Sequence, residues 1–229
     1  MRELRPIKSP IEIELTQHAC DITKNAFLRV LKFVKPGVME YEIEAEIIHE
    51  FIKNRATGHG YTPIIASGNN ANILHYTDNN QPCKDGELIL MDFGAEYANY
   101  NADMTRTIPV NGKFTKRQKE VYNAVLHVLN ESKKLMVAGA IWNTYHEEVG
   151  EIMTEQLVNL KLISTTDVKN QNPKYPAYKK YFMHGNTHHL GIDVHDLAGR
   201  HTPFAAGNIL TCEPGIYIPE EGFGVRLEN

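Results

Sequence analysis

Apolar residues spaced three and four positions apart mark the first element that the sequence predicts. They recur over residues 15–33 and form one stripe along an amphipathic helix. Ser9 and Glu12 make a capping box ahead of this stripe, with proline at the first helical position, and Pro36 with the glycine after it ends the helix. A second apolar stripe predicts another helix over residues 40–56.

The same order of elements is predicted again further along the chain. Thr115 and Gln118 form a second capping box, and an apolar stripe follows it as far as Gly139. The elements expected after residue 56 are strands and turns over residues 61–109, helices over 115–139 and 144–160, a surface loop over 163–178, and strands from 181 to the end. Two helices followed by strands therefore occur twice, which favours a duplicated α+β fold over a doubly wound one.

Composition excludes several classes of protein. The chain has 229 residues, 42% of them hydrophobic and 23% charged, which is typical of a globular protein. A net charge of −4 gives no basic surface for nucleic acid. The N-terminus lacks the apolar core of a signal peptide, and no apolar run approaches the ~20 residues that span a bilayer. We therefore expect no membrane or nucleic-acid partner.

Cysteine usage points to a reducing compartment. The three cysteines, Cys20, Cys83 and Cys212, are odd in number and lack CxxC spacing. Neither a disulfide framework nor a zinc–thiolate site is expected from this arrangement, and a cytoplasmic location fits it better.

Carboxylates that interrupt apolar runs are the chief chemical signal. Four such residues stand out: Asp92, Asp103, Glu213 and Glu228. An unpaired carboxylate is expensive to bury, so four of them together with a histidine indicate a metal site that compensates the charge. Two divalent cations would neutralise four carboxylates. Oxygen-rich ligation suits Mn²⁺ or Mg²⁺, with Co²⁺, Fe²⁺ and Zn²⁺ as alternatives.

Asp92 and Asp103 could face each other across a hairpin. A turn centred near Tyr97 and Ala98 would place the two aspartates directly opposite on one face. Two facing carboxylates repel, and shared divalent cations would remove that objection. Two aspartates at loop edges in water explain the spacing equally well.

Four of the 11 histidines lie within residues 184–196. In an extended segment His184 and His188 share a face, whereas His189 points to the opposite side and is interpreted as structural. Gly191 can provide the bend that redirects His195.

The C-terminal carboxylates have simpler explanations on their own. Glu213 precedes a Pro-Gly turn signal, and its neighbour Cys212 points to the opposite face of the strand, into the core. Arg226 and Glu228 alternate on one strand face, and an exposed strand face explains them better than a site does.

Several stretches together resemble a known family, the pita-bread metallopeptidases, and within it the Xaa-Pro aminopeptidases. They are Ala71-Asn72-Ile73-Leu74-His75-Tyr76, Met91-Asp92-Phe93-Gly94, Ala102-Asp103-Met104-Thr105-Arg106-Thr107, residues 184–196, Glu213-Pro214-Gly215-Ile216-Tyr217 and Arg226-Leu227-Glu228. The resemblance runs from about Leu4 to the end. It implies a pseudo-twofold α+β fold around a curved antiparallel sheet, with residues 1–229 as one catalytic domain.

The resemblance also implies roles for individual residues. The implied ligands of two divalent ions, Mn²⁺ first and Co²⁺, Zn²⁺ or Fe²⁺ as alternatives, are Asp92, Asp103, His188, Glu213 and Glu228. Glu213 would also transfer a proton to the leaving nitrogen. His75 and His195 would hydrogen-bond the substrate and its oxyanion, His184 would line the proline pocket, and Arg226 would orient a ligand carboxylate. The implied reaction removes the N-terminal residue from peptides whose second residue is proline.

Other members of the fold family are the rival interpretations. An Xaa-Pro dipeptidase (prolidase) shares these motifs. A non-catalytic peptide-binding module typically loses metal ligands, whereas all five are kept here. The run over residues 190–196 disfavours a methionine aminopeptidase.

The chain departs from the family pattern at three places. Asn186-Thr187 replaces the usual residues after His184-Gly185 and is expected to change the pocket wall. The family's N-terminal domain is missing, and the chain ends one residue after Glu228, before a further strand. We therefore expect a catalytic fragment of a longer protein that can form homo-oligomers.

Overall fold

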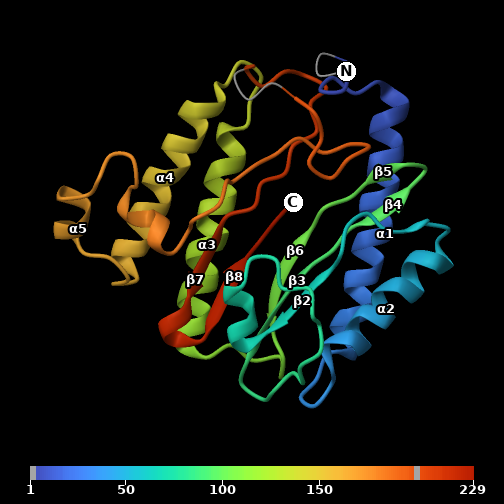
Figure 1. The fold of residues 1–229 in the computed structure, drawn as a ribbon, viewed down its shortest axis with the longest axis horizontal. Coiled ribbons are helices and arrows are strands. Elements are labelled where there is room, and N and C mark those ends of the chain that lie inside the picture. The colour runs from blue at the N-terminus through green and yellow to red at the C-terminus, as the bar shows by residue number, and fades with distance from the viewer. Residues whose placement is uncertain (1–3, 199–201) are drawn as a thin grey trace.

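The computed structural model describes residues 4–198 and 202–229. Helices α1 (Pro10–Phe33) and α2 (Glu40–Lys53) lie on one side of the strands (Figure 1). The predicted capping box is present, since the Glu12 carboxylate accepts hydrogen bonds from Ser9 N and Oγ, both at 2.7 Å. Helix α2 ends three residues before the predicted boundary, where Arg55 takes a left-handed φ of 67°.

Helices α3 (Lys116–Leu135) and α4 (Trp142–Asn159) lie on the other side of the strands (Figure 1). The Thr115–Gln118 capping box opens α3 as predicted. The helix ends before Gly139, because the following segment pairs with Phe204. Gly139 N donates to Phe204 O at 2.7 Å, and Phe204 N donates to Ala140 O at 2.8 Å.

The surface loop predicted over residues 163–178 contains a short helix. Helix α5 (Thr165–Lys169) and the 3-10 turn η2 (Ala177–Lys180) occupy parts of it. Ser164 caps α5: its Oγ accepts from Asp167 N at 3.1 Å, and its N donates to Asp167 Oδ2 at 2.7 Å. A local cap therefore folds this polar stretch, and the loop prediction is wrong there.

Short antiparallel strands occupy the space between the helix pairs. They are β1 (Gly58–His59), β2 (Ile64–Ser67), β3 (Leu88–Asp92), β4 (Ala95–Tyr97), β5 (Tyr100–Asn101), β6 (Thr105–Pro109), β7 (Gly215–Ile218) and β8 (Phe223–Arg226), with 3-10 turns η1 (Gly68–Asn72) and η3 (Pro219–Glu221). The described sheets have the orders β2-β3-β6, β1-β4-β5 and β7-β8. The α+β class expected from the sequence is confirmed.

The hairpin register differs from the prediction. Asp92 on β3 lies opposite Thr105 on β6, not opposite Asp103. The turn falls at Ala98 and Asn99, whose φ values of 50° and 69° are both left-handed, as a two-residue type I′ turn requires. Since Asp103 is two residues from Thr105, it remains on the face of Asp92 as a diagonal neighbour.

The strands predicted from residue 181 onward are only partly present. Strands β7 and β8 form, whereas residues 181–198 and 202–214 contain only an isolated bridge between His189 and Leu210. The segment around His188 still runs antiparallel to the chain before β7: Leu190 N donates to Ile209 O at 3.0 Å and Thr211 N to His188 O at 2.9 Å. Local bonds such as Asp196 N to His189 O curl the rest into a loop.

Hydrogen bonds join β8 and the residues after it to β6, and so connect the half of the fold that contains α1 and α2 to the half that contains α3 and α4. Thr107 Oγ1 donates to Arg226 O at 3.0 Å and accepts from Arg226 N at 3.2 Å. Glu228 N donates to Thr105 O at 3.0 Å. One apolar cluster packs α1 and α2 on β3, and another packs α3 and α4 on β7 and β8. The C-terminal end of β3 and the residues after β8 consequently meet at the centre of the molecule.

Candidate active site

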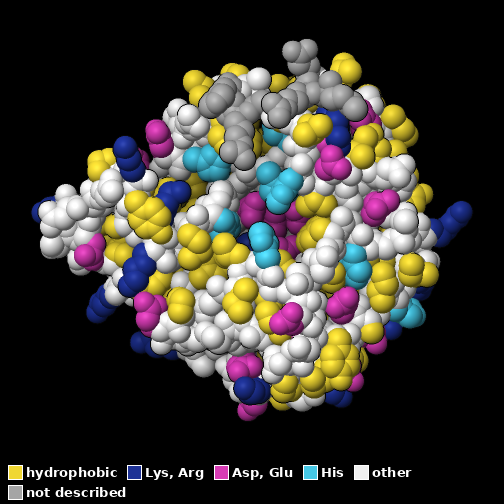
Figure 2. Space-filling view, viewed as in Figure 1, with side chains coloured by type: hydrophobic (Ala, Val, Ile, Leu, Met, Phe, Trp, Pro, Cys, Tyr) yellow, Lys and Arg dark blue, Asp and Glu magenta, His cyan; other side chains and the backbone are white. Residues whose placement is uncertain are grey.

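A cavity of about 890 Å³ opens at the junction of the two halves. Figure 2 shows acidic side chains at the bottom of a hollow with histidines around it. All five implied ligands line this cavity: Asp92, Asp103, His188, Glu213 and Glu228. The structure thus brings together residues as distant in sequence as Asp92 and Glu228, which are 136 positions apart.

The five implied ligands lie at the ends of strands or in the segments that connect them. Asp92 is the last residue of β3, Glu213 comes two residues before β7, and Glu228 comes two residues after β8. Asp103 lies between β5 and β6, and His188 belongs to the segment that runs antiparallel to residues 209–213. Each side chain is therefore held by backbone pairing on at least one side.

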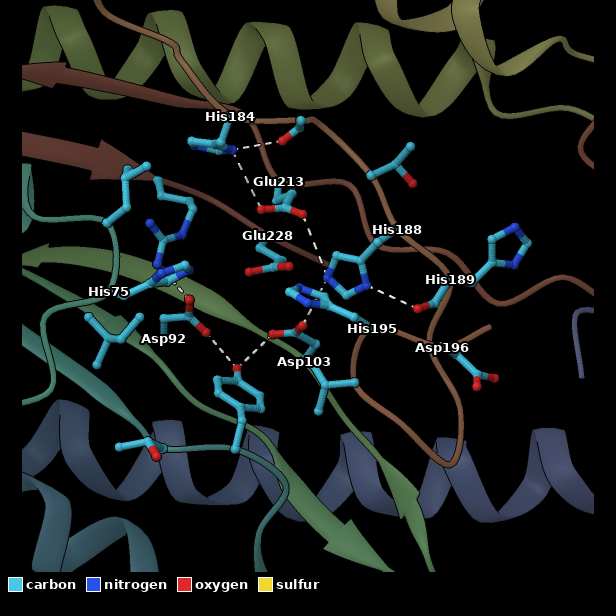
Figure 3. Close-up of a pocket in the computed structure, with 18 of the residues that line it drawn as sticks. His75, Asp92, Asp103, His184, His188, His189, His195, Asp196, Glu213 and Glu228 are labelled. Atoms are coloured by element: carbon cyan, nitrogen blue, oxygen red, sulfur yellow. Dashed lines mark hydrogen bonds and ion pairs between the residues drawn. The ribbon is translucent and has the colours of Figure 1, made fainter. Parts of the chain in front are cut away.

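Three of the implied ligands, Asp103, His188 and Glu228, have polar atoms close enough together to hold one ion. His188 Nε2 is 3.3 Å from Asp103 Oδ2 and 3.6 Å from Glu213 Oε1. One ligand atom each from Asp103, His188 and Glu228 fall within 4.8 Å of one another. Figure 3 shows Asp92 beside Asp103, with Glu213 and Glu228 converging from the other side.

Tyr61 joins the two aspartates and was missed by reasoning from the sequence. Its hydroxyl is 2.5 Å from Asp92 Oδ1 and 2.6 Å from Asp103 Oδ1. A phenol has one hydrogen and can donate to only one of them at a time. Burial, followed by the nearby carboxylates, raises the pKa of Tyr61 well above its usual value. No pattern around Tyr61 sets it apart from the other tyrosines.

Electrostatics favour additional positive charge in the cluster. Burial raises the pKa of Glu213 to about 7, and burial with repulsion from Asp103 raises the pKa of Glu228 well above its usual value. The pKa of Asp92 is also raised by burial, although Arg226 opposes that shift. Buried like charges of this kind are stabilised by bound cations, and four carboxylates with one imidazole form a donor set that fits hard divalent ions.

Arg226 and Glu228 are buried, with 4% and 2% of their surface exposed, so the exposed strand face expected for them is wrong. The reason is the packing of β8 on β6. Arg226 Nη1 donates to Tyr217 Oη at 2.8 Å and Nε to Thr105 Oγ1 at 3.0 Å. Thr105 Oγ1 in turn donates to Glu228 Oε2 at 2.6 Å.

The histidines expected to contact substrate surround the carboxylates. His75, His184 and His195 all line the cavity. His184 Nε2 is 2.8 Å from Tyr217 Oη, and burial lowers the pKa of His184 to about 4, so its ring is neutral near pH 7. The ring of His195 packs edge-on against that of His188, with centroids 4.4 Å apart.

The ring of His189 points away from the cluster (Figure 3). It stacks on Trp142 with an interplanar angle of 8° and centroids 5.9 Å apart.

The two residues that depart from the family pattern, Asn186 and Thr187, lie in different surroundings. Asn186 is fully buried and donates to Tyr145 Oη at 2.6 Å, outside the cavity, whereas Thr187 lines the cavity. The expected change of pocket wall therefore concerns Thr187 only.

Comparisons with known proteins agree on one family. The model of metallopeptidase family M24 matches residues 14–229. An Xaa-Pro aminopeptidase of Haemophilus influenzae is 41% identical over 244 residues, which cover 100% of this chain and 56% of that protein. The chain therefore spans about half the length of the curated relatives it matches.

Solved structures give the same result. Proline aminopeptidase P II from Yersinia pestis superposes with a TM-score of 0.93 at 39% identity, covering 99% of this chain and 55% of that one. A zinc-substituted Escherichia coli aminopeptidase P in complex with product gives a TM-score of 0.92 at 40% identity, covering 98% and 53%. The fold implied by the sequence resemblance is confirmed.

Proposed function

Because the chain belongs to metallopeptidase family M24, we propose that it is the catalytic part of an aminopeptidase that cleaves between an N-terminal residue and a following proline. The observation that carries this proposal is the convergence of four carboxylates and one histidine on a single cavity. The likeness over the whole chain to Xaa-Pro aminopeptidases supports the proline specificity. Residues 1–229 are proposed to act as one catalytic domain.

Two divalent ions would be held by Asp92, Asp103, His188, Glu213 and Glu228. When bound, such ions offset the carboxylate charge, hold the substrate's amino group and activate water. The oxygen-rich donor set makes Mn²⁺ the first choice, with Co²⁺, Zn²⁺ and Fe²⁺ as alternatives. The likeness to a zinc-substituted E. coli enzyme supports a divalent ion without deciding which one.

Glu213 is the proposed proton carrier. Its carboxylate lines the cavity, with Oε1 3.6 Å from His188 Nε2, so it is placed to accept and release a proton beside the reacting atoms. It can take the proton of the attacking water and pass it to the leaving nitrogen. Cleavage of a peptide bond requires this step, because the leaving amine must gain a proton as the C–N bond breaks, and the ring nitrogen of proline carries no hydrogen of its own.

The surrounding residues are proposed to bind the substrate and to orient one of the metal ligands. His75 and His195 are proposed to donate to the substrate carbonyl as negative charge develops on it. His184, kept neutral by burial and engaged with Tyr217, forms the wall against the proline ring. Arg226 is proposed to hold Asp92 in place through their ion pair at 2.5 Å.

The free cysteines support a cytoplasmic protein, since Cys20, Cys83 and Cys212 form no disulfide. In the described part of the chain, no helix is long and apolar enough to cross a membrane.

The proposal is tested by comparing peptides Xaa-Pro-Xaa, Xaa-Ala-Xaa and the dipeptide Xaa-Pro, using the full-length protein with added Mn²⁺. We expect cleavage of Xaa-Pro-Xaa, little of Xaa-Ala-Xaa, and loss of all activity on chelation. Equal cleavage of the proline and alanine peptides would overturn the specificity. A strong preference for the dipeptide would identify an Xaa-Pro dipeptidase instead, and no cleavage of any peptide would favour a binding module.

A further inference from the structure

A buried carboxylate on α2 holds the loop that carries His75. Glu40, the first residue of α2, is fully buried. Its Oε1 accepts from Ser67 N at 2.8 Å, Ser67 Oγ at 2.7 Å and Asn70 Nδ2 at 3.1 Å. Its Oε2 accepts from Tyr76 Oη at 2.7 Å and Gln81 N at 2.9 Å. All five donors come from residues 67–81, so one side chain holds both ends and the middle of this segment.

These hydrogen bonds replace the solvation of the Glu40 carboxylate. Among residues 4–198 and 202–229, no lysine or arginine forms an ion pair with Glu40. A buried carboxylate without a cation depends on its hydrogen-bond donors, and each donor removed leaves an uncompensated charge. The position of Glu40 in the first turn of α2 also places it in the favourable field of the helix N-terminus. Moving residues 67–81 away would leave the Glu40 carboxylate without hydrogen-bond donors. The free-energy cost of that loss holds the segment in place.

Tyr76 is the donor next to His75. Its ring is buried, with 6% exposed, whereas His75 projects into the cavity (Figure 3). Burial and the bond to Glu40 raise the pKa of Tyr76 to about 12, so the phenol keeps its proton and donates. The backbone hydrogen bonds near His75, Ile73 N to Asn70 O at 2.9 Å and Tyr76 N to Ile73 O at 3.2 Å, stay within the segment and do not join it to the rest of the fold. The direction of the His75 side chain therefore depends on the anchored neighbour.

We propose that the hydrogen bond from Tyr76 to Glu40 is the positioning device for His75, which fixes the imidazole before substrate arrives. This inference rests on the proposed function, in which His75 contacts the substrate. The bond joins a neutral donor to a carboxylate and is correspondingly strong. Positioning of this kind matters because a displacement of about 1 Å at a reacting group can lower the rate by roughly 100-fold. Tyr76 and Glu40 are thus positioning residues, and neither one lies among the implied metal ligands.

The test is a double-mutant cycle with Tyr76→Phe and His75→Ala in the full-length, Mn²⁺-loaded protein. Tyr76→Phe keeps the ring and removes only the hydroxyl. We expect kcat/KM for Xaa-Pro-Xaa to fall about tenfold while metal content stays unchanged. In the His75→Ala background, Tyr76→Phe should cause no further loss. Fully additive losses would show that Tyr76 does not act through His75 and would overturn the proposal.

Tyr100→Phe is the matched control. Tyr100 Oη donates to Glu12 Oε1 at 2.8 Å, so this variant removes the same kind of bond outside the cavity. We expect its kcat/KM to equal that of the parent. If Tyr76→Phe does not fold, Glu40→Asp enters the same cycle, because it keeps the charge and draws the carboxylate back from Tyr76.

Hydrogen exchange separates this inference from the proposed function. Tyr76→Phe should speed exchange over residues 73–78, and Tyr100→Phe should not. If exchange over residues 73–78 is faster but the parent has no peptidase activity, the hydrogen bond from Tyr76 to Glu40 still holds the segment and the proposed function is rejected. If the parent is an active peptidase but a folded Tyr76→Phe shows unchanged exchange or an unchanged kcat/KM, the positioning role of this bond is rejected and the proposed function stands.

Discussion

Arg226 Nη2 lies 2.5 Å from Asp92 Oδ2, in an ion pair whose two side chains are only 5% and 13% exposed. This guanidinium also lines the cavity and donates to Tyr217 and Thr105. It therefore compensates one of the four carboxylates independently of any bound ion.

Replacing Arg226 by Met should strongly destabilise the metal-free chain. The substitution leaves Asp92 buried beside other carboxylates, and removal of one partner of a buried pair typically costs about 3–5 kcal/mol. The free energy of unfolding in urea, measured with EDTA present, checks this. Arg117→Met is the control, because its partner Glu221 is 31% exposed and surface pairs contribute about 0–1 kcal/mol. Equal effects of the two substitutions would contradict the assigned role.

Neighbouring histidines should differ in their effect on metal binding. His188→Ala removes a ring that faces Asp103 and Glu213 and should reduce metal content strongly. His189→Asn alters a ring that stacks on Trp142 and should leave metal content nearly unchanged. Metal analysis after dialysis against Mn²⁺ measures both. Equal losses would mean that His189 also contributes to the metal site.

Glu213→Gln should abolish turnover with only partial loss of metal. The amide cannot carry the proton, and general acid–base contributions are typically about 10²–10⁴-fold. Steady-state rates at matched metal occupancy are the measurement. A metal-loaded Glu213→Gln protein with parental kcat would exclude Glu213 as the proton carrier.

His59 should make the chain less stable in acid. Burial lowers the pKa of His59, and its two ring nitrogens are buried without hydrogen-bond partners. As pH falls below the unfolded value of about 6.5, the unfolded state takes up the proton first, so stability decreases. His59→Leu removes this titration.

The free energy of unfolding of the metal-free chain should therefore fall less between pH 7.5 and 5.5 in His59→Leu than in the parent. His127→Gln, at an exposed position, is the control and should behave like the parent. A parental pH dependence in His59→Leu would refute the assignment.

The sequence by itself determined the features that depend on near neighbours. Ser9 with Glu12 and Thr115 with Gln118 set the starts of α1 and α3, because a cap needs only residues within one helical turn. Carboxylates that interrupt apolar runs identified the residues that later proved to line one cavity. These signals are local, so they can be recognised without knowing the tertiary arrangement.

Only the tertiary structure decided which faces are buried and which groups meet. The alternation of Arg226 and Glu228 predicts an exposed strand face. In the structure both residues are buried, because they pack on Thr105 and Thr107 of β6, about 120 residues away in sequence. Tyr61 reaches Asp92 and Asp103, and Glu40 reaches Tyr76, across 31 to 42 positions. No local pattern encodes such contacts, because the burial that makes them favourable arises only when the two halves of the fold pack together.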